Sequence, residues 1–278
     1  MKKKVEEKSA AIDIEIKLFL EAIYLKSGYD FREYAPESVK RRILRRLAFS
    51  GFENISAMQH RVLNDNHFLE LLLQDFSINV TQMFRDASFY KALRKSVLPV
   101  LKEKPFIKIW HAGCSTGEEV YSMAILLKEK DLYENSRIYA TDSNIDVIHK
   151  AKKGIYSLDR IKEYTAGYQR AGGKGSFADY YTASYDMAIM NNNLKKNIIF
   201  SDHNLVTDFS FGEMDLIMCR NVMIYFSMEL QNKVISLFLT SLKKGGFLCL
   251  GAKETIAFSS YSEYFENFIK KEKIFMKK

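Results

Sequence analysis

The chain has 278 residues, of which 47% are hydrophobic, and its 42 basic residues outnumber 34 acidic ones. This length suits one large domain, or a small domain joined to a larger one. The formal net charge of +8 is moderate and the three cysteines form no CxxC pair, so neither a nucleic-acid footprint, a disulfide framework nor a zinc site is indicated.

Residues 1–77 are predicted to form a small helical domain. The apolar residues of IEIKLFLEAIYL recur at helical spacing and are interrupted by Glu15, Lys17 and Glu21, which predicts an amphipathic helix rather than a signal peptide. A second helix is expected to begin at Pro36 and to stop at Gly51. No run approaches the ~20 apolar residues that cross a bilayer, so we expect a cytoplasmic protein without direct membrane insertion.

The second helix carries five basic residues in seven positions, KRRILRR at residues 40–46. Arg41 with Arg45, and Arg42 with Arg46, are i,i+4 pairs, and like charges at this spacing are mildly destabilising. The pattern therefore suggests an acidic partner. The residues alone leave three explanations open: a solvated surface, an RNA backbone, or a receptor helix that bears glutamates.

From about residue 97 the sequence alternates between short β-rich runs and helical segments. This alternation predicts a mostly parallel sheet with helices on both faces. The final segments, YFENFIKK and EKIFMKK, are expected to form a hairpin or an antiparallel edge. The β-rich runs occupy residues 106–112, 137–142, 197–203, 214–219 and 246–251.

Residues 156–196 interrupt this alternation with a glycine cluster, AGGKG at 171–175, and six tyrosines. A long irregular connection in a compact α/β domain is usually a functional insertion. The alternative for its glycine-rich tip is a surface loop without a role.

The stretch IWHAGCSTGEEVYS at residues 109–122 places a glycine-containing turn at the end of the first expected strand. Its G-x-x-x-G spacing matches neither the dinucleotide fingerprint nor the Walker motif, and it contains no lysine to meet a phosphate. Gly113 and Gly117 would let the backbone approach a ligand closely. The next strand ends in Asp142, and an acid at that place commonly accepts hydrogen bonds from ribose hydroxyls.

Two acids, Glu118 and Glu119, follow the turn. A carboxylate suits an amino or sulfonium group, so S-adenosylmethionine, a nucleoside with a positive charge and no phosphate, fits this site. The alternative is that both acids only favour the dipole at the helix N-terminus. We assign the dipole role to Glu118 and the ligand contact to Glu119.

Five motifs follow one another along the chain: INVTQMFRD (78–86), AGCSTGEEVYS (112–122), ATDSN (140–144), DHNL (202–205) and MCRNVMIYF (218–226). Together they strongly resemble the chemotaxis receptor methyltransferases, the CheR family of protein-glutamate O-methyltransferases, over essentially the whole chain. The resemblance implies an α/β fold, a class I S-adenosylmethionine-dependent methyltransferase with a Rossmann-like doubly wound sheet, a small all-helical N-terminal domain and an inserted subdomain. It implies a receptor-recognition domain at 1–77 and a cofactor-binding domain at 78–278, with the insertion at about 156–196.

The resemblance also implies roles for individual residues. Arg85 matches a position that lines the active site, and Tyr225 matches a tyrosine beside the transferred methyl group. Receptor recognition falls to the basic helix and its residues Arg41, Arg42, Arg45 and Arg46. The expected cofactor contacts, which include Gly113 from the turn, are Asn79, Thr81, Arg85, Gly113, Glu119, Asp142, Asn204, Leu205, Arg220 and Asn221.

The implied reaction moves a methyl group from S-adenosylmethionine to glutamate side chains of a chemoreceptor or related sensory receptor, giving glutamate methyl esters and S-adenosylhomocysteine. Glutamate has an unperturbed pKa of ~4.3 and is already a carboxylate nucleophile at neutral pH, so no general base is required. Arg85 and the Tyr225 hydroxyl are expected to hold this carboxylate. A nucleic-acid methyltransferase and a non-catalytic cofactor-binding adaptor are the alternatives.

The expected partner is the cytoplasmic helical region of a methyl-accepting receptor, with recruitment to receptor arrays at the inner membrane as a further expectation. No nucleic acid and no metal is expected. The insertion differs in spacing and composition from the family loop that tethers a receptor-tail peptide, so tethering is left open.

Overall fold

The computed structural model describes residues 2–76 and 81–278. The chain divides into two compact units, one of residues 1–78 with 225–231 and one of residues 79–224 with 232–278. The predicted cofactor residue Asn79 lies outside the described residues. Among the residues that are described, no helix is both long and apolar enough to cross a membrane.

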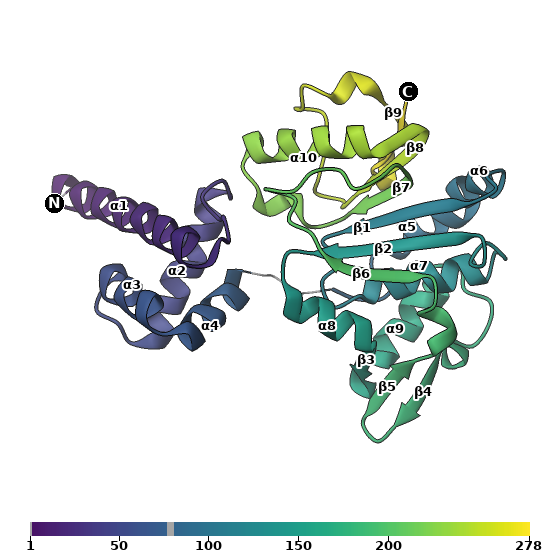
Figure 1. The fold of residues 1–278 in the computed structure, drawn as a ribbon, viewed down its shortest axis with the longest axis horizontal. Helices are drawn as coiled ribbons and strands as arrows, with labels where there is room; N and C mark the ends of the chain where they lie inside the picture. Colours follow the sequence, from purple (N-terminus) through teal and green to yellow (C-terminus); the bar gives the residue numbers. More distant parts are fainter. Residues whose placement is uncertain (1, 77–80) are drawn as a thin grey trace. The chain divides into compact units, whose positions relative to one another are not determined.

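The described part of the first unit is helical: α1 (Lys2–Ser27), α2 (Pro36–Ser50), α3 (Ile55–Asn64) and α4 (Asn66–Phe76) (Figure 1). The predicted limits of α2 are confirmed, because Pro36 occupies its first turn and Gly51 ends it in the left-handed conformation. The helices share one apolar core, whose fully buried side chains include Phe19, Ile23, Ile43, Met58, Val62 and Leu72.

Residues 225–231 belong to this helical unit although they are distant from it in sequence. The backbone of Phe226 forms an antiparallel β-bridge with Tyr34. On either side of the bridge, the Ala35 amide donates to the Tyr225 carbonyl at 2.8 Å, and the Ser227 amide donates to the Glu33 carbonyl at 3.0 Å. The backbone of Tyr225 is therefore held by the segment that leads into α2.

The second unit contains a seven-stranded sheet with the order β6-β2-β1-β7-β8-β10-β9 (Figure 1). Neighbouring strands from β6 to β8 are parallel. Strand β10 is antiparallel to both of its neighbours, β8 and β9, which confirms the predicted terminal hairpin. The strands are β1 (Ile107–Ala112), β2 (Ser136–Asp142), β6 (Ile198–Asp202), β7 (Met214–Cys219), β8 (Leu242–Leu250), β9 (Phe265–Ile269) and β10 (Ile274–Lys277). The five predicted β-rich runs all form strands, but β8 begins four residues earlier than predicted and takes up the Gly-Gly pair.

Helices cover both faces of this sheet. The order reverses between β1 and β7, so right-handed crossovers place the helix after β1 and the helix after β7 on opposite faces. In agreement, Ile109 packs in the core cluster that contains Val120, whereas the ring of Trp110 contacts the ring of Phe238, with centroids 5.5 Å apart. The helices are α5 (Ala87–Ala92), α6 (Leu98–Lys102), α7 (Glu118–Lys128), α8 (Ile145–Lys153), α9 (Leu158–Arg170) and α10 (Met228–Ser241), with a π-helical turn (Leu93–Val97) between α5 and α6.

The insertion contains a small ordered subdomain, while its glycine cluster, residues 171–175, forms a turn and loop after α9, in line with the loop alternative for this part. After β3 (Ile155–Ser157) and α9, the strands β4 (Tyr181–Ser184) and β5 (Met187–Met190) complete a three-stranded antiparallel sheet with the order β3-β5-β4. Within this cluster Gly173 packs closely, because a Cβ there would lie 2.2 Å from the ring of Tyr168, whereas Gly172, Lys174 and Gly175 are exposed. The exposed tip of the β4–β5 hairpin carries Tyr185.

Candidate functional site

The predicted cofactor residues gather where the parallel strands β1, β2, β6 and β7 end. The turn after β1 is tied to β2, because the amides of Gly113 and Cys114 donate to the Thr141 carbonyl at 2.9 and 2.8 Å. The Ser115 amide donates to the Asp142 carboxylate at 2.9 Å. Ligands of doubly wound sheets bind at this edge, beside the point where strand order reverses.

Asp142 is half-buried at the end of β2. One of its carboxylate oxygens accepts from the Ser115 amide and the other accepts from the Asn144 amide at 3.1 Å. Burial raises the pKa of Asp142, while these backbone hydrogen bonds oppose the rise. Each carboxylate oxygen has a second lone pair, so Asp142 can still accept hydrogen bonds from a ribose.

The two glycines of the turn are required by the protein's own packing. Gly113 has a φ of +78°, and a Cβ there would lie 2.6 Å from Val222. Gly117 has a φ of +91°, and a Cβ there would lie 2.9 Å from the Cβ of Ala151 on α8. Both positions therefore favour glycine before any ligand is considered.

Glu118 starts α7 and is fully buried, which goes beyond the dipole role predicted for it. Its carboxylate accepts from the Thr116 hydroxyl at 2.6 Å, from the Arg160 guanidinium at 2.9 Å and from the Tyr164 hydroxyl at 3.2 Å. Burial raises the pKa of Glu118. Glu118 thus joins the turn to α9, and its side chain is used within the protein.

Glu119 is differently placed, with 19% of its side chain exposed. Its carboxylate lies 3.0 Å from Nη1 of Arg220 and 3.2 Å from Nδ1 of His111. Burial alone would raise the pKa of Glu119, but the hydrogen bond with His111 and the charge of Arg220 hold it below its ordinary value. Glu119 is therefore a fixed, ionised carboxylate at the ligand-binding edge of the sheet.

Arg220 follows β7 and its side chain is only 2% exposed. The guanidinium pairs with Glu119 and, at 2.7 Å, with Asp86, and its carbon lies 3.9 Å from the centroid of the Phe89 ring. Nη1 and Nη2 of the group predicted to touch the cofactor are used in these pairs, while Nε is buried and has no hydrogen-bond partner in the described part of the chain. Arg220 thereby orients Glu119 and ties it to the motif around Arg85, and its contact with the cofactor stays a prediction.

The motif around Arg85 has an unusual backbone. Phe84 and Asp86 take positive φ values of 54° and 57°, which are uncommon for residues other than glycine. The Phe84 amide donates to the Ser122 hydroxyl at 2.9 Å, and this hydroxyl donates to the Glu118 carbonyl. Strained backbone held by neighbouring structure occurs often at functional sites. Arg85 itself is half-buried.

Three further predicted cofactor residues are Asn204 and Leu205, which follow β6, and Thr81 in the first motif. Asn204 and Thr81 are half-buried. Asn204 uses its side-chain oxygen to accept from the Val206 amide at 2.9 Å, and Leu205 is buried. The loop that carries them is fixed to β2, since the His203 amide donates to the Asp142 carbonyl at 3.1 Å. Thr81, at the start of the second unit, uses its carbonyl to accept from Arg160.

The sequence did not point to Glu254, which organises the loop after β7. Its buried carboxylate accepts from the amides of Asn221 and Val222, both at 2.9 Å, and of Ile224 at 3.3 Å. It also accepts from the amide of Gly251 at the end of β8. The predicted cofactor residue Asn221, with a φ of 62°, is held in this way.

In the helical unit, the four arginines of α2 divide into two pairs. Arg41 and Arg45 are exposed. Arg42 is buried and donates to the Phe76 carbonyl, and Arg46 pairs with Asp75 of α4. The prediction that all four face a receptor is therefore wrong for Arg42 and Arg46, whose side chains are engaged inside their own unit.

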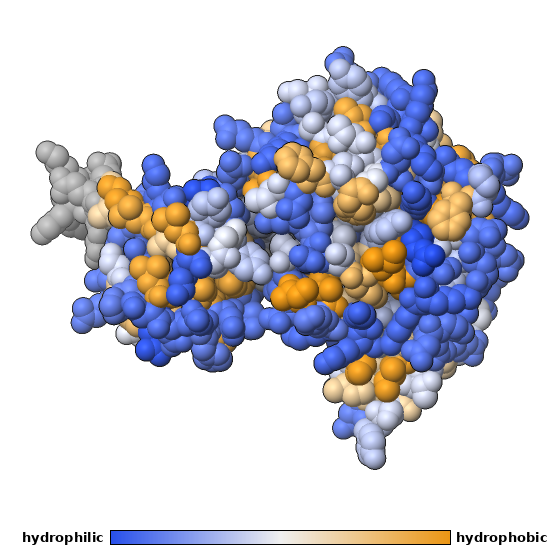
Figure 2. Space-filling view, in the orientation of Figure 1, coloured by the Kyte–Doolittle hydropathy of each residue, from blue (hydrophilic) through white to orange (hydrophobic). Residues whose placement is uncertain are grey.

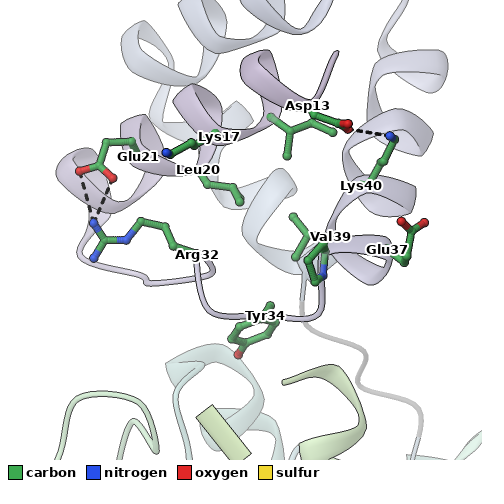
Figure 3. Close-up of a pocket in the computed structure, with 11 residues that line it drawn as sticks. Asp13, Lys17, Leu20, Glu21, Arg32, Tyr34, Glu37, Val39 and Lys40 are labelled. Carbon is green, nitrogen blue, oxygen red and sulfur yellow. Dashed lines mark hydrogen bonds and ion pairs between the residues drawn. The ribbon is translucent and has the colours of Figure 1, made fainter. Parts of the chain in front are cut away.

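A cavity of about 420 Å³ lies between α1 and α2 in the helical unit (Figure 3). Leu20 and Val39 point into it, and an ion pair of 2.7 Å joins Lys40 to Asp13 at its rim. None of its lining residues belongs to the predicted cofactor site. On the outer side of α1 the apolar side chains of Ile14, Leu18 and Leu25 are exposed, and apolar colour marks this helix in Figure 2.

Known proteins resemble this chain over both units. Residues 79–274 match the family model described as the SAM binding domain of CheR methyltransferase, and residues 14–77 match its all-alpha domain. One relative is a Pseudomonas putida protein named as a methyltransferase, Cher3. It is 51% identical over 95% of this chain and 97% of its own length. Chemotaxis protein methyltransferases of Borreliella burgdorferi and Listeria monocytogenes are 32% and 30% identical, over 90% and 82% of this chain and 91% and 85% of their own lengths.

Proposed function

Because the chain belongs to the CheR methyltransferase family, we propose that it methylates glutamate side chains of a chemotaxis receptor or related sensory receptor. The cofactor is S-adenosylmethionine, which supplies a methyl group on a positively charged sulfur. The side chains present fit this molecule, since the ligand-binding edge offers two acceptors, the carboxylates of Glu119 and Asp142, and its turn contains no lysine. The observation that carries the proposal is the carboxylate of Glu119, held at this edge by Arg220 and His111 with part of its side chain still exposed.

In the proposed reaction a carboxylate oxygen of the receptor glutamate forms a bond to the methyl carbon while the bond from that carbon to sulfur breaks. No proton is transferred, because the nucleophile is ionised at neutral pH. The protein's contribution is alignment and exclusion of water. We propose that Glu119 orients the amino or sulfonium group and Asp142 the ribose, and that Arg85 and Tyr225 hold the incoming carboxylate.

Receptor recognition is proposed for the exposed arginines of α2. Arg41 and Arg45 share one exposed side of the helix, one turn apart. This pair offers two positive charges to an acidic helix, such as one that bears methyl-accepting glutamates. The partner would then be the cytoplasmic helical region of the receptor, and methylation would remove negative charge from it.

The experiment is transfer of a labelled methyl group from S-adenosylmethionine to a purified receptor cytoplasmic domain. We expect label on the receptor that alkali releases as methanol, since methyl esters are base-labile. A receptor whose glutamates in the methylated region are replaced by alanine is the control and should take up no label. Alkali-stable label on RNA, or tight cofactor binding without any transfer, would contradict the proposal.

A further inference from the structure

Arg42 is the buried member of the basic helix, and it faces Tyr225. The residue is 7% exposed, and the carbon of its guanidinium lies 4.8 Å from the centroid of the Tyr225 ring. Both residues belong to the helical unit. A guanidinium over an aromatic face within about 6 Å of its centroid is a cation–π contact.

The hydrogen bonding of Arg42 leaves much of its guanidinium without a partner. Nη1 donates to the Phe76 carbonyl at the end of α4. Nε and Nη2 are buried and have no hydrogen-bond partner in the described part of the chain. Burial also lowers the pKa of Arg42. A buried, incompletely paired charge is costly, and an apolar side chain would serve stability better.

The backbone of Tyr225 is fixed independently of Arg42. The Ala35 amide donates to the Tyr225 carbonyl at 2.8 Å, and the next residue, Phe226, forms the β-bridge with Tyr34. The rings of Tyr34 and Phe226 also meet edge to face, with centroids 5.0 Å apart. With the backbone held in this way, the remaining freedom is rotation of the Tyr225 side chain, which the stacked guanidinium restricts.

We propose that Arg42 is a positioning residue that fixes the Tyr225 ring, and so places the Tyr225 hydroxyl for methyl transfer. The basic helix α2 then has two functions. Its exposed arginines, Arg41 and Arg45, recognise the receptor, and its buried Arg42 acts on the reaction through Tyr225. This inference rests on the proposed function, because it uses the role proposed there for Tyr225.

The kinetic test compares Arg42→Met, Arg42→Lys and Arg41→Met, each alone, with receptor methylation as the assay. Arg42→Met should lower kcat about tenfold, because the Tyr225 hydroxyl is no longer held in place for the reaction, while KM for the receptor and the Kd of S-adenosylmethionine change less than twofold. Arg42→Lys keeps a cation and should recover part of the loss. Arg41→Met, the matched loss of charge on the exposed side, should raise KM and leave kcat unchanged.

A double-mutant cycle separates positioning from a merely structural role. In a Tyr225→Phe background the hydroxyl is already absent, so adding Arg42→Met should lower kcat less than threefold further. A full tenfold loss in that background, or a change in KM instead of kcat, would overturn the inference. Thermal unfolding of each variant shows whether the protein is folded at the assay temperature.

A measurement without turnover keeps this inference distinct from the proposed function. In protein labelled with 3-fluorotyrosine, the resonance of residue 225 is assigned as the one lost in Tyr225→Phe. Arg42→Met should shift and broaden that resonance, whereas Arg41→Met should leave it in place. An unchanged resonance overturns the positioning role even if receptor methylation is observed, and a wild-type protein that methylates no receptor overturns the proposed function even if the resonance moves.

Discussion

Replacing Glu119 by glutamine removes one negative charge from the cofactor edge and keeps the shape of the side chain. In the wild type the carboxylate is 3.0 Å from Arg220 and 3.2 Å from His111, and 19% of the side chain remains exposed to meet a ligand. A hydrogen bond to a charged group contributes about 1.5–3 kcal/mol. We therefore expect Glu119→Gln to weaken S-adenosylmethionine binding roughly ten- to hundredfold.

The substitution also has a cost for folding that can be worked from the same contacts. Without the charge of Glu119, the buried guanidinium of Arg220 keeps only Asp86 as an ionised partner, and the Asp86 side chain is 41% exposed. A buried donor that loses its charged acceptor costs about 1–3 kcal/mol. The free energy of unfolding should fall by this amount, measured by urea denaturation without cofactor.

Titration calorimetry with two ligands tells which group of the cofactor Glu119 contacts. S-adenosylmethionine carries an amino group and a sulfonium, whereas S-adenosylhomocysteine carries the amino group alone. If the carboxylate faces the amino group, Glu119→Gln weakens both ligands equally. If it faces the sulfonium, only S-adenosylmethionine is weakened.

Glu118→Gln is the matched control one residue earlier. The Glu118 carboxylate is fully buried and is directed to Thr116, Arg160 and Tyr164, so its replacement should change either dissociation constant less than threefold. Equal losses for the two variants would mean that distortion of the start of α7, and not ligand contact, explains the effect. Binding by Glu119→Gln within twofold of the wild type would refute the assignment of Glu119.

Three other predictions concern pH, charge and the loop after β7. The pKa of Glu119 is lower in the folded protein than its value of 4.5 in the unfolded chain. The contribution of Glu119 to stability is therefore present above pH 4.5 and is lost as the pH falls through the folded pKa. Acid unfolding curves should show a weaker pH dependence for Glu119→Gln than for the wild type. Charge reversal of Arg41 and Arg45 should raise KM for the receptor in a salt-sensitive way and leave cofactor binding intact. Charge reversal of the exposed Lys152 on α8 is the control and should change neither KM nor cofactor binding. Receptor methylation measures KM, and calorimetry measures cofactor binding. Glu254→Ala leaves four backbone amides without their acceptor and should lower the free energy of unfolding by about 3 kcal/mol in urea denaturation, more than Glu254→Gln does.

The arrangement of the second unit could be predicted because its strands are short and rich in apolar residues, with helical segments between most of them. The run MDLIMC at residues 214–219 became the fully buried strand β7, as expected of a central parallel strand. The start of β8 was missed because two adjacent glycines resemble a turn. Gly245 does have a turn-like, left-handed φ of 72°, but β8 pairs with β7 on both sides of it, through Leu242 and from Phe247 onward, with a register shift between Met214 and Leu216.

The inward direction of Arg42 and Arg46 could have been found from the sequence. An α-helix turns by about 100° per residue, and Val39 and Ile43 mark the side of α2 that enters the core. Arg42 follows Val39 by three residues and Arg46 follows Ile43 by three, so each lies about 60° around the helix from a core residue, near this apolar side. The i,i+4 rule correctly grouped the arginines, but it does not say which group faces the protein.

Contacts between distant segments were beyond reach of sequence patterns. Arg220 pairs with Asp86, which lies 134 residues earlier, and Glu254 binds amides that lie about 30 residues earlier. Both interactions depend on strand order, because they join loops that meet only when β1, β7 and β8 lie side by side. Arg220 was assigned to the cofactor by the family resemblance, and no sequence pattern indicated that two acids of the protein, Glu119 and Asp86, pair with it.

The strained residues of the second unit explain why the site needs these internal pairs. Of the seven residues other than glycine with positive φ in the described chain, four occur in the motifs of the cofactor edge, namely Phe84, Asp86, Ser115 and Asn221. Each has a fixed partner: Phe84 and Ser115 through amides bound to Ser122 and Asp142, Asp86 through Arg220, and Asn221 through Glu254. Strain of this kind persists only where the surroundings determine it. Alignment of a nucleophile with a methyl group gains most from groups that are already in place. The side chains of Ser122, Asp142, Arg220 and Glu254 hold these four residues in place.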